Sequence, residues 1–138
     1  MKIKHRPGVV LGPTEYGIDI ADPEAISIWR EFLKRQLLKD RPNICDCGCG
    51  ELIYLGEGID MHEGIITKGN TQGLPWQPLI YHEYNSFLVR HEHHMNRPML
   101  REHFFRLSCV RYGIDAIEVW LNTLPFKTRG KWPNTVSL

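Results

Sequence analysis

The sequence lacks any hydrophobic run that approaches the ~20 residues required for a membrane-spanning helix. Its first residues, Met1–Pro7, are basic, but no apolar core follows them, so the pattern of a secretory signal is missing as well. We therefore expect a cytoplasmic protein that has no membrane partner. In such a reducing compartment, closely spaced cysteines are more often metal ligands than disulfide partners.

Internal repeats, low-complexity stretches and a strong net charge are absent too. With 138 residues and a formal net charge of +1, the chain has the size and composition of one domain, residues 1–138. The positive charges are nevertheless grouped, with Lys34 and Arg35 in one block and Arg97 and Arg101 in another. Such blocks are compatible with a phosphate-binding face, although solvated helix surfaces would give the same grouping.

Hydrophobic periodicity and turn residues predict helical flanks around a more extended centre. Residues 1–41 begin with an irregular arm and continue as a helix at Asp22-Pro23, where an Asp cap precedes a proline in the first helical position. Two further helices are predicted within residues 98–124, and a polar tail follows at 125–138. The short apolar runs within residues 45–95 indicate strands, so the predicted fold class is α+β.

Two of these apolar runs predict a β-hairpin in the centre of the chain. Leu52–Leu55 and Ile59–Ile66 have strand-like composition, and a glycine-rich turn at 56–58 separates them. We expect the hairpin to end near His62.

The side chains typical of metal sites are concentrated in the same central region. Six of the seven histidines lie between His62 and His103, and three of the four cysteines form the run Cys45, Cys47 and Cys49. These cysteines are too close together to cross-link distant parts of the chain. Divalent-metal binding is therefore the first hypothesis for this region.

A histidine, an asparagine and a second histidine follow the cysteines along the chain. His62 ends an apolar strand, Asn85 begins a short apolar run, and His94 comes nine positions later on a predicted helix. This spacing suggests two ligand-bearing elements that fold onto one metal ion.

The order of these features resembles that of the HNH endonucleases, whose fold is called ββα-metal. The matching stretch is roughly residues 45–95, and Cys45–Glu51 is similar to the Cys-x-Cys-Gly-Cys-Gly-Glu run of some phage-encoded members. The resemblance implies a small ββα-metal centre with a zinc knuckle, flanked by N- and C-terminal helices, in a protein of a bacterial host or a phage.

The resemblance also assigns roles in phosphodiester hydrolysis. His62 would be the general base, because a neutral imidazole can take a proton from water near neutral pH. Asn85 would orient that imidazole or tie the loop to the strand. His94 would hold the catalytic divalent metal, Mg²⁺, Mn²⁺ or Ni²⁺.

One position departs from the family pattern. The residue before the catalytic histidine is usually a metal ligand, but here it is Met61, which cannot bind a hard cation. Asp60, on the same strand face as His62, is the preferred replacement as metal ligand. In the alternative register His62 is the ligand and Glu63 handles the water.

The resemblance also implies a separate structural zinc site, since related proteins place a second ligand pair just before the terminal histidine. Two of Cys45, Cys47 and Cys49, together with His91 and His93, would give the four ligands of a closed zinc site. The sequence leaves open which cysteine is spare.

The expected function is that of a metal-dependent DNA endonuclease or nicking enzyme whose basic blocks contact DNA phosphates. A zinc-stabilised DNA-binding or phage assembly module without cleavage activity is the alternative. The oligomeric state, monomer or homodimer, stays open at this point.

Overall fold

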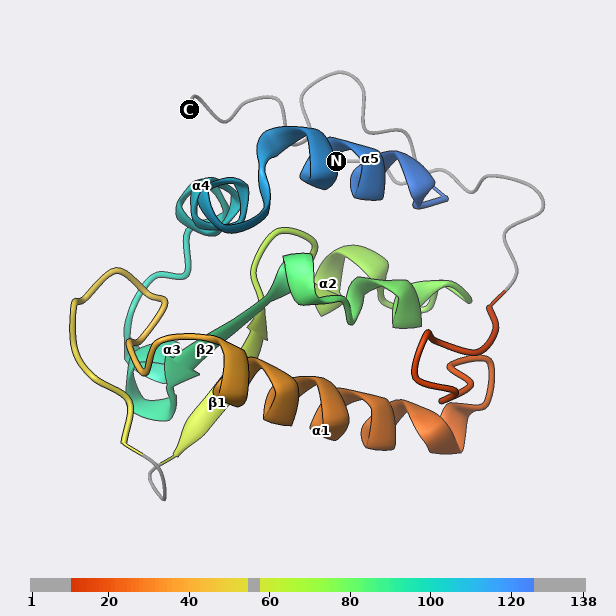
Figure 1. The fold of residues 1–138 in the computed structure, drawn as a ribbon, viewed down its shortest axis with the longest axis horizontal. Helices are drawn as coiled ribbons and strands as arrows, with labels where there is room; N and C mark the ends of the chain where they lie inside the picture. Colours follow the sequence, from red (N-terminus) through yellow and green to blue (C-terminus); the bar gives the residue numbers. More distant parts are fainter. Residues whose placement is uncertain (1–10, 55–57, 126–138) are drawn as a thin grey trace.

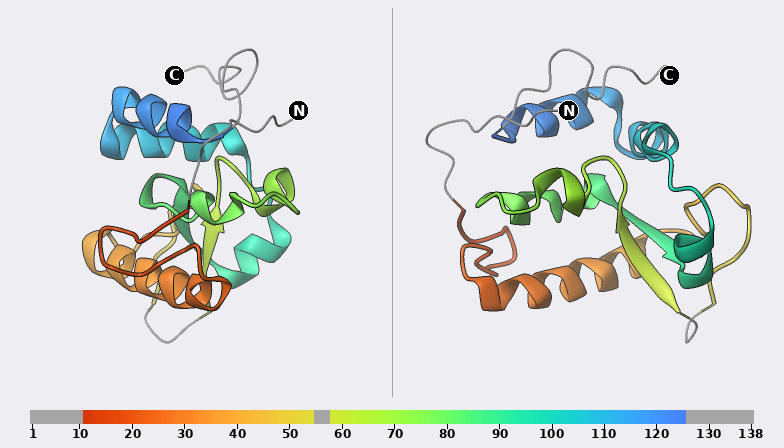
Figure 2. Two further views of the ribbon diagram at one scale, coloured as in Figure 1. Left: turned by 90° about the vertical axis from the view of Figure 1, so that its right-hand side faces the viewer. Right: turned by 180° about the vertical axis from the view of Figure 1, so that it is seen from behind.

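The structure is a computed structural model that describes residues 11–54 and 58–125. The beginning of the predicted arm and nearly all of the predicted tail lie outside these residues. Within the described part, the elements form three layers: α1 on one side, α4 and α5 on the other, and the strands with short helices between them (Figure 1, Figure 2). The mixture of helices with a small two-stranded sheet confirms the α+β class.

Helix α1 spans Pro23–Asp40, and its start confirms the prediction from Asp22-Pro23. The Asp22 carboxylate accepts a hydrogen bond from the Glu24 backbone nitrogen at 3.0 Å, which satisfies one of the free N–H groups of the first turn. Trp29, Leu33 and Leu37 recur every four residues and are buried on one face of the helix. This face packs α1 against the middle layer.

The sheet consists of β1, Ile59–Glu63, and β2, Ser86–Arg90, which pair antiparallel with His62 opposite Phe87. The predicted hairpin between Leu52–Leu55 and Ile59–Ile66 is therefore wrong, because the partner of β1 is β2. Leu52 instead forms an isolated bridge with Ile44. Every side chain of β2 except that of Arg90 is buried, so this strand is the central one for packing.

Short helices occupy the connection between the two strands, and a further one follows them. They are α2 (Lys68–Thr71), the 3-10 helices η1 (Gln77–Ile80) and η2 (Glu83–Asn85), and α3 (His91–Asn96), which begins immediately after β2. The chain thus runs strand, strand, helix through β1, β2 and α3.

Helices α4 (Arg101–Tyr112) and α5 (Ile114–Thr123) cover the other side of the middle layer. Gly113 joins them with a φ of +90°, a conformation that favours glycine. The ring of Phe104 on α4 packs against Phe87 of β2 with centroids 4.7 Å apart, and both residues are fully buried. None of the helices in the described part of the chain has the length and apolar character to cross a membrane.

Candidate metal centre and histidine pocket

The segment Cys45–Cys49, called the knuckle below, is a tight turn that is fixed to β2. Gly48 and Gly50 have φ values of +92° and +78°, which lets the backbone reverse twice within a few residues. The Asp46 backbone nitrogen donates to the Leu88 carbonyl at 2.9 Å. The knuckle therefore lies beside the strand that leads into α3.

Four potential zinc ligands meet at this point. Cys45, Cys47, Cys49 and His93 offer ligand atoms that all lie within 4.8 Å of one another. His93 Nδ1 is 3.6 Å from Cys45 Sγ and 3.5 Å from Cys47 Sγ, and the latter two sulfurs are 3.3 Å apart. A tetrahedral zinc ion with ordinary bond lengths separates its ligand atoms by about 3.5–3.8 Å. The four side chains are therefore positioned to bind a metal ion such as zinc.

The structure answers which residues of the expected zinc set come together. All three cysteines and His93 converge, so none of the cysteines is spare. His91 lies elsewhere: its side chain is 60% exposed and its Nδ1 is 2.8 Å from an oxygen of Asp60. The observed group contains three cysteines and one histidine, whereas two cysteines and two histidines were expected.

A carboxylate beside the second ring nitrogen of His93 is a further feature typical of a metal site. The Nε2 atom of His93 is 2.8 Å from the Glu51 carboxylate, while Nδ1 faces the sulfurs. A carboxylate that accepts the second ring N–H is the usual partner of a histidine that binds a metal. Glu51 follows the last cysteine of the knuckle by two residues, and the sequence analysis missed this role.

The two innermost thiols differ in their acidity. Burial raises the pKa of the Cys45 thiol to about 11. Burial also opposes ionisation of Cys47, but hydrogen bonds from Cys45 and Arg97 outweigh it and lower the pKa of Cys47 to about 7. Thiolates are the forms that bind zinc, and the hydrogen bond from Arg97 favours that form at Cys47.

Asp46 anchors the knuckle to the rest of the protein. Its buried carboxylate receives two hydrogen bonds from Arg111, at 2.6 and 3.1 Å, and one from the Leu88 backbone nitrogen at 3.0 Å. Arg41 lies 3.7 Å from the same carboxylate. Because both arginines come from other layers, α4 and the end of α1, this network joins the three layers at the metal centre.

His62 and His94 form the second candidate site. Their ring centroids are 4.9 Å apart in an edge-to-face arrangement, with His62 on β1 and His94 on α3. Both line a pocket of about 260 Å³, called the histidine pocket below. The other lining residues come from α1, β1, the N-cap of α2 and α2 itself: Arg30, Met61, Glu63, Thr67, Lys68 and Gly69.

The environment of His62 keeps its ring neutral. Burial, and then repulsion from His94, lower the pKa of His62 to about 4. At neutral pH the imidazole therefore has a free nitrogen lone pair, which can accept a proton or bind a metal.

Asp60 lies behind His94 and joins it to His91. One carboxylate oxygen, Oδ2, is 2.8 Å from Nδ1 of both histidines. Burial would raise the pKa of Asp60, but the hydrogen bonds with His94 and His91 outweigh it and lower the pKa. With Nδ1 of His94 committed to Asp60, Nε2 is the nitrogen that remains for a metal.

Glu63, the other carboxylate considered as a replacement ligand, is 6% exposed and pairs with Arg30 at 3.3 Å. Burial raises its pKa, against the opposing charges of Arg30 and Lys68. No third ligand joins His62 and His94 closely enough to form a compact group in residues 11–54 and 58–125.

Asn85 holds the loop that leads away from β1. The fully buried side-chain oxygen accepts hydrogen bonds from the backbone nitrogens of Ile65 and Ile66, each at 2.9 Å. The side-chain nitrogen donates to the carbonyls of Ile66 and Ile80 at the same distance. Asn85 was expected either to orient the His62 ring or to tie the loop to the strand, and these contacts are of the second kind.

The basic residues expected to face DNA occupy different environments. Arg35 and Arg97 are exposed, and Lys34 is half-buried. Arg97 donates to Cys47 Sγ at 3.5 Å. Arg101 is half-buried and donates to the Ile65 carbonyl and the Asn70 side chain at 2.9 and 3.0 Å, so it supports the loop beside the histidine pocket.

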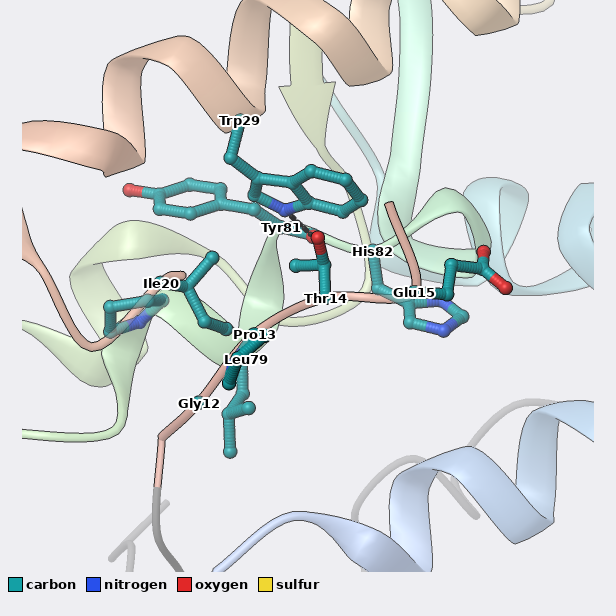
Figure 3. Close-up of a pocket in the computed structure, with 10 residues that line it drawn as sticks. Gly12, Pro13, Thr14, Glu15, Ile20, Trp29, Leu79, Tyr81 and His82 are labelled. Atoms are coloured by element: carbon teal, nitrogen blue, oxygen red, sulfur yellow. Dashed lines mark hydrogen bonds between the residues drawn. The ribbon is translucent and has the colours of Figure 1, made fainter. Parts of the chain in front are cut away.

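A second cavity, of about 310 Å³, is lined by the N-terminal arm, by Trp29 of α1 and by residues of η1 and the segment that follows it (Figure 3). Trp29, whose indole nitrogen donates to the Tyr81 carbonyl at 2.8 Å, forms one wall. His82, at the edge of the cavity, has its pKa lowered to about 4 by burial. The cavity wall is mostly apolar, and it carries none of the expected site residues.

No protein-family model matches this chain, and neither a curated protein nor a solved structure shows significant similarity to it.

Proposed function

We propose that the protein is a metal-dependent DNA endonuclease or nicking enzyme of the HNH type. The observation that carries the proposal is the pairing of His62 on β1 and His94 on α3 across one pocket, with α3 directly after β2, the strand that pairs with β1. The adjacent group of three cysteines and one histidine supports the zinc-knuckle part of the resemblance.

In the proposed reaction His62 accepts a proton from the attacking water. Its depressed pKa ensures that the ring is neutral at physiological pH, and the apolar contact with Phe104, at a centroid distance of 5.0 Å, limits its movement. A positioned base whose pKa lies near the operating pH contributes about 10²–10⁴-fold to a rate, and a base with the lower pKa of His62 contributes less.

His94 is the residue that would hold the catalytic metal, through Nε2, while Asp60 fixes the orientation of its ring. A bound divalent ion would offset negative charge on the phosphate and on the leaving oxygen. Asp60 thus holds the His94 ring through Nδ1, and water and phosphate oxygens would complete the coordination. Glu63 is held by Arg30 and is not assigned as a ligand here.

The test is a plasmid cleavage assay with zinc-loaded protein and added Mg²⁺, Mn²⁺ or Ni²⁺. We expect supercoiled plasmid to be nicked or linearised with at least one metal, and His62→Ala to abolish cleavage while thermal stability and DNA binding persist. His103→Ala is the matched control, because this imidazole lies outside the pocket and bonds to the Asp46 carbonyl at 2.6 Å.

Unchanged plasmid with all three metals, together with retained DNA binding, would instead support the alternative of a zinc-stabilised DNA-binding module. That alternative draws on the same knuckle and leaves the histidine pocket without a catalytic role.

A further inference from the structure

Two cationic side chains line the histidine pocket, and neither belongs to the basic residues singled out from the sequence. Arg30 reaches it from α1 and Lys68 from α2, so both border the same space as His62 and His94. These segments lie far apart in the chain, and only the fold brings the charges together.

Arg30 is held in place by two neighbours. Its Nη2 atom donates to Glu63 at 3.3 Å, and its guanidinium lies over the ring of Tyr81, 4.8 Å from the centroid. Stacking and an ion pair fix the plane of a guanidinium. Within the described part of the chain, the buried Nε of Arg30 has no hydrogen-bond partner, and the side chain as a whole is 32% exposed, so the guanidinium is held in place and still borders the pocket.

The charge and size of the pocket suit one small anion. Lys68 is exposed, and its charge adds to that of Arg30, whereas Glu63 is the only carboxylate in the lining. A volume of about 260 Å³ is below the range of roughly 300–1,000 Å³ that is typical for drug-sized ligands.

We infer that Arg30 and Lys68 form a phosphate subsite, which binds the non-bridging oxygens of the DNA phosphodiester placed beside His62 and His94. This inference rests on the proposed function, whose substrate it places in the pocket. Arginine suits the role because its planar donors match phosphate oxygens, and each charge-assisted hydrogen bond is stronger than a neutral one.

The test measures DNA binding in the His62→Ala background, so that the probe stays intact. A short fluorescein-labelled duplex is titrated with zinc-loaded protein at several salt concentrations. We expect Arg30→Gln and Lys68→Gln each to weaken binding by about tenfold and to flatten the plot of log affinity against log salt by roughly 0.9. Arg30→Lys should fall between wild type and Arg30→Gln.

The matched control is Lys39→Gln, which removes one positive charge near the end of α1, outside the pocket lining. Arg30→Gln alone leaves the buried Glu63 carboxylate without its partner, which could destabilise the fold. The double variant Arg30→Gln/Glu63→Gln removes both charges of the pair and so separates loss of binding from loss of stability. Lys68→Gln leaves that pair intact. The inference is overturned if the pocket variants behave like Lys39→Gln, or if the protein binds no DNA.

Cleavage assays of the same changes in the His62 protein separate the two proposals. Arg30-dependent binding without any cleavage by wild type would leave the phosphate subsite standing and remove the nuclease. Cleavage that is unaffected by Arg30→Gln and Lys68→Gln would leave the nuclease standing and remove the subsite.

Discussion

His93→Ala should release the zinc ion and destabilise the protein strongly. His93 is the only ligand of the group that comes from α3, and it lies 48 residues from Cys45 along the chain. A zinc ion between them acts as a cross-link. Closing a loop of this length with a covalent cross-link stabilises a protein by about 4 kcal/mol, chiefly by restricting the unfolded chain.

The free energy of unfolding should therefore fall by about 4 kcal/mol in His93→Ala, a large share of the roughly 5–15 kcal/mol typical of a domain. The midpoint of thermal unfolding should fall by roughly 10–20 °C. Urea titration and thermal melts of zinc-loaded protein, with zinc content measured by mass spectrometry, provide the assay.

His91→Ala is the matched control, because it removes an imidazole two residues away that lies outside the four-ligand group. We expect this variant to keep its zinc and nearly all of its stability. Zinc retained by His93→Ala but lost from His91→Ala would refute the assignment of ligands.

Three further predictions concern groups that support these sites. Asn85→Ala should lower the free energy of unfolding by at least about 3 kcal/mol in urea titrations, because the backbone nitrogens of Ile65 and Ile66 and the Ile66 carbonyl lose the partner that Asn85 gives them. Asp46→Asn should cost about 3–5 kcal/mol by the same measurement, since Arg111 and Arg41 lose a buried counter-charge. The folded-state pKa of His82, about 4, lies below its ordinary 6.5, so folding releases a proton; stability should decline as pH falls from about 6.5 to 4, and less steeply in His82→Gln.

Local chemistry explains which parts of the fold could be predicted from the sequence. The start of α1 follows from a capping Asp22 and Pro23, signals that act within a single turn. The partner of β1 could not be derived in the same way, because β2 is separated from it by the segment that contains α2, η1 and η2. Strand pairing over such a distance depends on tertiary packing, and proximity along the chain favoured the wrong partner.

The same distinction applies to the sites. Residue types and spacing predicted roles for the cysteines, which converge with His93, and for His62, Asn85 and His94, whereas the partners that orient these side chains could not be found. The contacts of Glu51 with His93, of Arg30 with Glu63 and of Asp60 with His94 depend on which side chains face each other in space. The expectation that His91 binds zinc failed to match the structure for this reason, since His91 and His93 lie two residues apart on a helix and point to different partners.

The short helix α3 gives the two candidate metal sites a shared component. His93 and His94 are consecutive residues, so their side chains leave the helix about 100° apart, one toward the knuckle and the other toward the pocket. Zinc at the knuckle would fix the rotation of α3 about its axis and so limit the directions that the His94 ring can take. Binding at one site should then alter affinity at the other by the same factor in both directions, as thermodynamic linkage requires.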